Sequence, residues 1–138
     1  MHGERRQLKS MDKLKQVYLD ANAVLRYVLH DIDDQYDIVL KSVRTEYCVA
    51  PLEVMTEVAF VLEGVYGVPR EEMVKLFRKL SQEVVISNTD VFLRALEVFD
   101  KSPKLNFVDC LMYGYKIARG ADVLTFDKKL NKKLNGEG

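Results

Sequence analysis

The chain has 138 residues, a length that predicts one domain able to bury a hydrophobic core without disulfides. Hydrophobic residues make up 48% and charged residues 30%, as in ordinary globular domains, and 21 basic side chains balance 21 acidic ones. A net charge of zero excludes a chain-wide attraction to nucleic acid or membranes, so any nucleic-acid site has to be a local basic patch.

The cysteines and the N-terminal residues bear on the compartment. Cys48 and Cys110 lie in apolar surroundings without a Cys-x-x-Cys motif, so we expect buried thiols rather than a disulfide, which fits a cytoplasmic protein. The first sixteen residues lack the apolar core of a secretory signal, and no stretch approaches the roughly 20 apolar residues of a membrane span. We expect a flexible tail over residues 1–15 and a single domain over residues 16–134.

Short apolar runs alternate with helical periodicity along the chain. Strands are expected at 17–19, 48–50, 83–87 and 122–126. Helices are expected at 21–29, 33–45, 51–65, from 71 to the third strand, from 89 to the Ser102-Pro103 pair, at 106–119, and as a short lysine-rich helix or tail after 126. This alternation predicts an α/β protein with a parallel sheet covered by helices on both faces.

Four acidic residues fall at positions that such a sheet gathers. Asp20 ends the first strand, Asp127 follows the last, Asp109 opens the helix at 106–119, and Glu57 lies within the helix at 51–65. Strand ends and helix starts meet at the carboxyl edge of a parallel sheet, where these folds bind ligands. Crowded carboxylates repel unless they take up protons or share a cation, and oxygen ligands suit magnesium or manganese. The pattern therefore predicts a metal-dependent site that acts on phosphates.

Two of the four acids also have an ordinary structural interpretation. Asp20 and Asp127 are equally well placed as helix N-caps. Glu57 and Asp109 have apolar neighbours, and we expect them to be buried and therefore paired or liganded, with Glu53 as the alternative to Glu57.

Further polar residues are candidates for supporting roles. Asn22 and Thr125 are placed to hydrogen-bond a carboxylate or a water, or else to stabilise a turn. A basic run follows Asp127, either as a phosphate-binding surface or as a solvated helix face. Its candidates are Lys128, Lys129, Lys132 and Lys133, with Lys104, Arg26 and Arg119 if the fold brings them near.

The segments around the four acids resemble those of PIN-domain nucleases. Tyr18-Leu-Asp-Ala-Asn-Ala-Val-Leu25 resembles the opening motif of that family, and Glu57-Val58 resembles its second acid. Phe107-Val-Asp-Cys-Leu111 and Leu124-Thr-Phe-Asp-Lys128 resemble the third and fourth motifs, so the resemblance covers residues 17–130. Residue 21 is Ala, where Thr or Ser is also common in the family, which removes one hydroxyl contact but no acid.

The resemblance implies a three-layer α/β/α sandwich with a short parallel sheet. It implies a Mg²⁺- or Mn²⁺-dependent ribonuclease in which Asp20, Glu57, Asp109 and Asp127 are the catalytic and metal-binding residues. Many small members are toxins of VapBC-type toxin–antitoxin pairs, so it also implies a homodimer blocked by a small antitoxin protein. A housekeeping RNA-processing nuclease and a non-catalytic PIN-fold binding module are the alternatives.

Two other classes that gather acids at strand ends fit less well. A receiver-like phosphoacceptor needs an acidic pair after its first strand, where Asp20 stands alone. A dehalogenase-type phosphatase needs a second Asp two residues after the first, where Asn22 stands.

Overall fold

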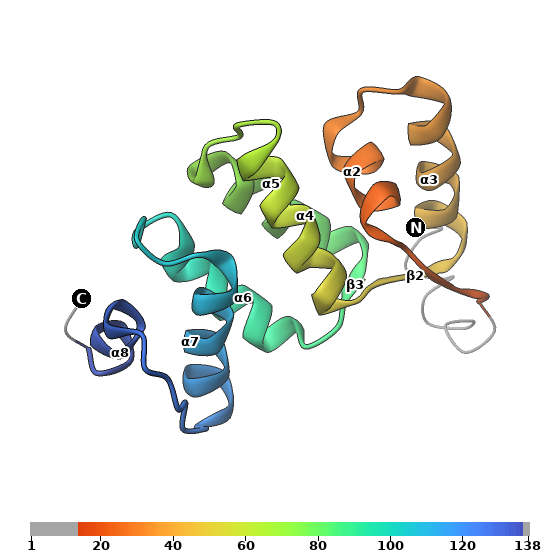
Figure 1. The fold of residues 1–138 in the computed structure, drawn as a ribbon. Helices are drawn as coiled ribbons and strands as arrows, with labels where there is room; N and C mark the ends of the chain where they lie inside the picture. The colour runs from red at the N-terminus through yellow and green to blue at the C-terminus, as the bar shows by residue number, and fades with distance from the viewer. Residues whose placement is uncertain (1–13, 137–138) are drawn as a thin grey trace.

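The structure, a computed structural model, describes residues 14–136 (Figure 1). It is mostly helical, with a short three-stranded parallel sheet, and is consistent with an α/β/α sandwich. In chain order the elements are β1 (Gln16–Tyr18), α2 (Ala21–Leu29), α3 (Asp33–Thr45), β2 (Tyr47–Ala50), α4 (Leu52–Gly64), α5 (Arg70–Glu83), β3 (Val85–Ile86), α6 (Thr89–Phe99), α7 (Phe107–Arg119) and α8 (Lys128–Leu134).

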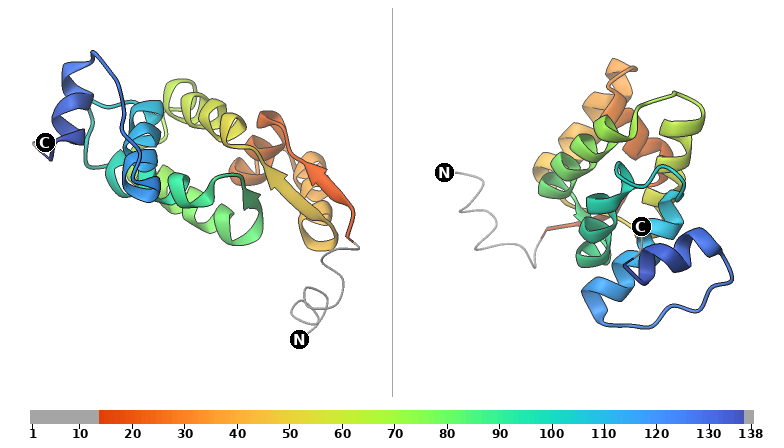
Figure 2. Two further views of the ribbon diagram at one scale, coloured as in Figure 1. Left: turned by 90° about the horizontal axis from the view of Figure 1, so that it is seen from below. Right: turned by 90° about the vertical axis from the view of Figure 1, so that its left-hand side faces the viewer.

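The sheet has the strand order β1-β2-β3, and each connection between parallel strands contains a pair of helices. Val17 pairs with Cys48, and Val49 pairs with Val85. Beyond β3 the chain continues as α6, α7 and α8, which extend away from the sheet. In Figure 1 and in the left view of Figure 2, α8 and β1 therefore lie at opposite ends of an elongated molecule.

The core is continuous from the sheet to α7 because each helix turns an apolar face inward. Four phenylalanines from α5, α6 and α7 are at most 2% exposed, namely Phe77, Phe92, Phe99 and Phe107. Phe107 packs edge-on against Phe99, with ring centroids 5.3 Å apart, the geometry that aromatic quadrupoles favour. This cluster fixes α7 against α5 and α6.

Helices α6 and α7 approach unusually closely at Gly114. A Cβ atom at this position would lie 2.5 Å from the carbonyl oxygen of Val91, a distance that real side chains do not adopt. At the C-terminal end of α7, the Arg119 guanidinium donates to the Asp90 carboxylate, with Nε 2.6 Å from Oδ2. This hydrogen bond lowers the pKa of Asp90 to about 2. The whole length of α7 is thus fixed against α6.

Most predicted elements are confirmed, and one is wrong. Residues 122–126 form no strand, and the side chains of Leu124 and Phe126 are 90% and 93% exposed. The physical reason is that a strand needs the edge of another strand to satisfy its backbone N–H and C=O groups. The edge strand β1 lies at the far end of the molecule. The predicted strand at 83–87 is reduced to Val85–Ile86.

The structure tests part of the predictions made from the cysteines, the N-terminal residues and the hydropathy. Cys48 and Cys110 are free and buried as predicted, and burial raises the pKa of Cys110 to about 12. Within residues 14–136, no helix is long and apolar enough to cross a membrane. The predicted tail over residues 1–15 lies mostly outside the described residues.

We predict that Gly114→Ala lowers the free energy of unfolding by about 1–3 kcal/mol, because the added methyl group must push α7 away from the Val91 carbonyl. Gly64→Ala is the matched control, since its Cβ atom meets nothing within 4 Å at the end of α4 and Ala favours a helix. Urea unfolding followed by circular dichroism measures both. Equal stability of the two variants would contradict the close packing of α6 and α7.

Candidate functional site

Three of the four predicted acids take part in capping the first turn of a helix. Asp20 Oδ1 accepts a hydrogen bond from the Ala23 N–H of α2 at 2.8 Å, and Asp127 Oδ1 accepts one from the Leu130 N–H of α8 at 2.8 Å. Asp109 forms a reciprocal capping box with Asn106 at the start of α7, with distances of 2.8 and 3.0 Å. In each case the cap uses one carboxylate oxygen, and the helix dipole favours the negative charge.

The structure does not bring the four acids together. Asp20 lies next to β1, whereas α7 and α8, which carry Asp109 and Asp127, lie toward the opposite end of the molecule (Figures 1 and 2). Across residues 14–136, no group of three or more His, Cys, Asp and Glu is placed so that it could hold a metal ion. The donor chemistry suits a divalent ion, but the arrangement of the donors within one chain does not.

The expectation that Glu57 and Asp109 are buried is not met. Glu57 is exposed and Asp109 is half-buried, and no polar or charged residue in the described part of the chain belongs to the fully buried set. The apolar neighbours of Glu57 belong to another face of α4, where Met55, Val58 and Ala59 pack into the core. Residues one apart on a helix do not share a face, so the apolar sequence neighbours of Glu57 do not indicate that Glu57 itself is buried.

The two supporting residues differ in their surroundings. Thr125 Oγ1 accepts a hydrogen bond from the Asp127 N–H at 3.1 Å, and the Thr125 carbonyl accepts one from Asn131 Nδ2 at 3.0 Å. Thr125 therefore orients the start of α8 and, with it, Asp127. Asn22, two residues after Asp20, is exposed on α2.

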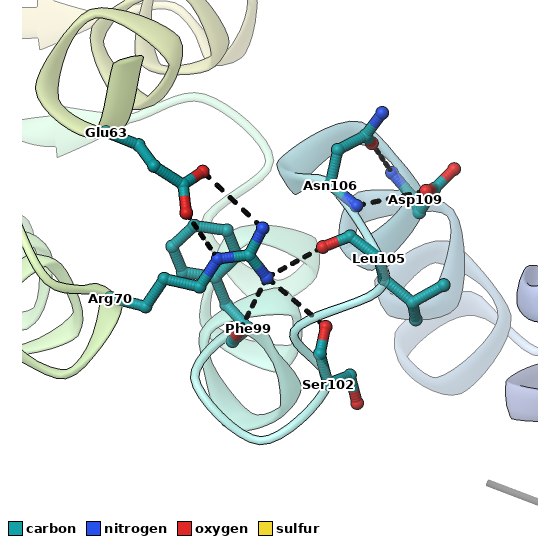
Figure 3. Close-up of polar contacts among 7 residues, drawn as sticks. All are labelled: Glu63, Arg70, Phe99, Ser102, Leu105, Asn106 and Asp109. Carbon is teal, nitrogen blue, oxygen red and sulfur yellow. Dashed lines mark hydrogen bonds and ion pairs between the residues drawn. The ribbon is translucent and has the colours of Figure 1, made fainter. Parts of the chain in front are cut away.

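The segment that leads into Asp109 is held by Arg70, the first residue of α5 (Figure 3). Its guanidinium Nε donates to Glu63 Oε2 at 2.6 Å, and its planar face lies 4.2 Å from the centroid of the Phe99 ring. Nη1 donates to three backbone carbonyls, those of Phe99 at 3.0 Å, Ser102 at 3.2 Å and Leu105 at 2.7 Å. Leu105 directly precedes Asn106, so Arg70 determines where the capping box of α7 begins.

A cavity of about 260 Å³ separates this same segment from α8. Five lysines line it, with no acidic residue among them: Lys101, Lys104, Lys129, Lys132 and Lys133. Ser102 is also a lining residue, although its hydroxyl oxygen is buried and has no hydrogen-bond partner. Lysine ammonium groups without an acidic neighbour in the lining make this cavity suitable for an anion.

The two arginines considered with the lysine run lie elsewhere. Arg26 Nη1 is 3.4 Å from Asp31 Oδ2, and its Nη2 donates to the Tyr66 hydroxyl at 3.3 Å. Arg119 is paired with Asp90 and also donates to Asn88. Neither lines the lysine cavity, whereas Lys104 does, and Lys128 is exposed at the start of α8.

The family follows from a comparison of the chain with protein-family models. The model described as PIN domain matches residues 17–134, nearly the whole described region and all four acids. The chain belongs to the PIN domain family. PIN domains are generally nucleases, so this PIN domain has a nuclease-type fold. Neither a curated protein nor a solved structure matches the chain.

Arg70 was not singled out by the sequence, although a signal for it exists. A cation in the first turn of a helix faces the positive end of the dipole, an unfavourable position unless the side chain is paired elsewhere. Arg70 stands directly after Pro69 in this first turn, and Glu63 is the acid at the end of the preceding helix. An arginine at this place in the chain therefore indicates an acidic partner nearby.

We predict that Arg70→Lys lowers the free energy of unfolding by about 2–3 kcal/mol. A lysine keeps the charge but cannot donate to Glu63 and to three carbonyls from one planar group. Arg94→Lys is the matched control, because Arg94 forms an exposed pair with Glu97 and the change should cost less than about 0.5 kcal/mol. Urea unfolding measures both, and similar losses for the two variants would show that Arg70 has no special role.

Proposed function

We propose that this PIN domain is a divalent-metal-dependent endoribonuclease that cleaves RNA phosphodiester bonds. The observation that carries the proposal is the lysine-lined cavity next to α8, the helix that Asp127 caps. A nuclease-type fold with a cationic cavity on the helix of a candidate catalytic acid fits a polyanionic substrate.

The lysines explain how a chain of zero net charge attracts RNA. Ammonium groups bind phosphates with release of counterions and without reading bases, so they hold the backbone and fix its position. Lys128 and Lys129 continue this surface toward Asp127.

Asp20, Glu57, Asp109 and Asp127 are the proposed catalytic and metal-binding residues. Their carboxylate oxygens are the donors that Mg²⁺ and Mn²⁺ prefer, which supports a divalent ion as the cofactor. Each capping aspartate uses one oxygen for its helix, so the other oxygen is available to an ion or a substrate. Because the four acids are dispersed in one chain, the proposed site requires further assembly.

We place this PIN domain among toxins of toxin–antitoxin pairs, with a small antitoxin protein as its partner. The support is the resemblance of the motifs around Asp20 and Asp127 to those of PIN-domain nucleases, many small members of which are toxins of VapBC-type pairs. A housekeeping RNA-processing nuclease and a non-catalytic binding module remain the alternatives, and the next experiment distinguishes them.

The proposed activity predicts cleavage of a mixed panel of structured and unstructured RNAs with Mg²⁺ or Mn²⁺ and none with EDTA. Asp20→Asn should reduce the rate at least about a hundredfold, because the variant removes one charge from the site. Asp34→Asn, in the first turn of α3, is the matched control and should cleave like the parent. Product analysis by gel electrophoresis is the measurement.

Each result has a distinct meaning. Equal rates for the parent and Asp20→Asn would remove Asp20 from the site, and no cleavage of any RNA would favour the binding module. A toxin also arrests growth when it is expressed from an inducible promoter, whereas Asp20→Asn does not; a processing nuclease leaves growth unchanged.

RNA binding should depend on the lysine cavity. The triple variant Lys101→Gln, Lys104→Gln, Lys132→Gln should reduce the magnitude of the slope of log affinity against log salt concentration by roughly 2. This change corresponds to about a hundredfold weaker binding at 0.1 M salt. Anisotropy of a labelled single-stranded RNA in EDTA measures binding without cleavage. The matched control, Lys41→Gln with Lys75→Gln and Lys79→Gln, removes three lysines of α3 and α5, and an equal loss in both variants would contradict the assignment.

A further inference from the structure

The outer edge of β1 is open. The strand order β1-β2-β3 places β1 at one side of the sheet, and within residues 14–136 no other strand pairs with it. The Tyr18 side chain on this strand is 63% exposed. An edge strand presents unpaired N–H and C=O groups that template the addition of another extended segment.

The same chain carries a segment that fits such an edge. Residues 121–127 connect α7 and α8 without regular structure, and they contain the β-prone run Val123-Leu-Thr-Phe126. Leu124 and Phe126 are almost fully exposed, and residues two apart point to the same face of a strand. Addition to a sheet would bury both side chains and satisfy the backbone of the segment.

This segment is held away from its own β1 at both ends. On one side, Arg119 and Gly114 fix α7 against α6. On the other side, Leu130 of α8 is 3% exposed and the Asn131 amide donates to the Thr125 carbonyl. Transfer of the segment to β1 of its own chain, at the far end of the molecule, would require α8 to leave the core (Figures 1 and 2).

We propose that residues 121–127 pair as a parallel fourth strand with β1 of a second copy of this chain, and that the exchange is reciprocal. Donor segment and acceptor edge lie at opposite ends of each copy, so two copies related by a twofold axis satisfy both edges and close the assembly.

The exchange also completes the proposed site, and in this respect it rests on the proposed function. In a parallel pair, the carboxyl end of the added strand lies beside the carboxyl end of β1. Asp127 follows the segment and Asp20 follows β1, so each site combines Asp127 of one copy with Asp20 of the other. The dispersal of acids within a single chain then has a structural reason.

Cross-linking tests the interface without any activity. Tyr18→Cys and Leu124→Cys are made in separate chains with different affinity tags, co-refolded and treated with a short bismaleimide. We expect a covalent dimer that carries both tags, while the buried Cys48 and Cys110 react slowly. Ile38→Cys on α3 is the matched control for Tyr18→Cys, because it is 68% exposed but lies off the sheet edge, and it should give little of this dimer with Leu124→Cys.

Three results would overturn the proposal. One is efficient cross-linking within a single chain that carries both Tyr18→Cys and Leu124→Cys, while the two separately tagged chains give no mixed-tag product. Another is equal cross-linking by the Ile38→Cys control. The third is a mass distribution of open oligomers in light scattering, because it would show a head-to-tail rather than a reciprocal exchange.

Complementation tests the composite site. In a mixed dimer of Asp20→Asn and Asp127→Asn, one of the two sites contains both native acids. About half of the dimers in an equal mixture are mixed, so the mixture should recover about a quarter of the parent activity. No recovery, with a parent that cleaves RNA, overturns the composite site. A mixed-tag cross-link with a parent that cleaves no RNA supports the exchange and instead counts against the proposed nuclease activity.

Discussion

The hydrogen bonds of the Arg70 guanidinium are the interactions on which the C-terminal half of the molecule depends. It joins the end of α4, the start of α5 and the connection between α6 and α7, which are remote from one another in sequence. A planar group with several fixed donors can satisfy a carboxylate and three carbonyls at once while its face covers Phe99. Both the capping box of Asp109 and one wall of the lysine cavity follow from the segment that it holds.

The acids of the candidate site also have a structural role in the fold. Asp20, Asp109 and Asp127 stabilise the first turns of three helices, where their charge also meets the positive end of the helix dipole. Capping and the proposed catalysis do not compete, because they use different oxygens of the same carboxylate. The two interpretations of Asp20 and Asp127 that the sequence leaves open are therefore compatible.

The sequence predicts local elements well and their assembly less well. Helices α2, α3 and α7 appear at the expected residues because their apolar periodicity and capping signals are contained in the elements themselves. The segment at 122–126 has the composition of a strand, but pairing depends on an edge that its own chain presents at the opposite end. Glu57 was predicted to be buried from its sequence neighbours, although its side chain lies on an exposed face of α4. Arg70 was missed because three of its partners are backbone carbonyls, and the sequence shows only a cation in the first turn of a helix and the acid Glu63 in the preceding helix.

The lysine cavity also couples the stability of the fold to what the protein binds. Five ammonium groups without an acidic neighbour in the lining repel one another, and α8 supplies three of them while it holds Leu130 in the core. Any polyanion that binds only the folded state relieves this repulsion and shifts the folding equilibrium by mass action. We therefore expect the helix α8 to be held less firmly at low ionic strength than at high ionic strength, and its folding to be thermodynamically linked to the occupancy of the cavity.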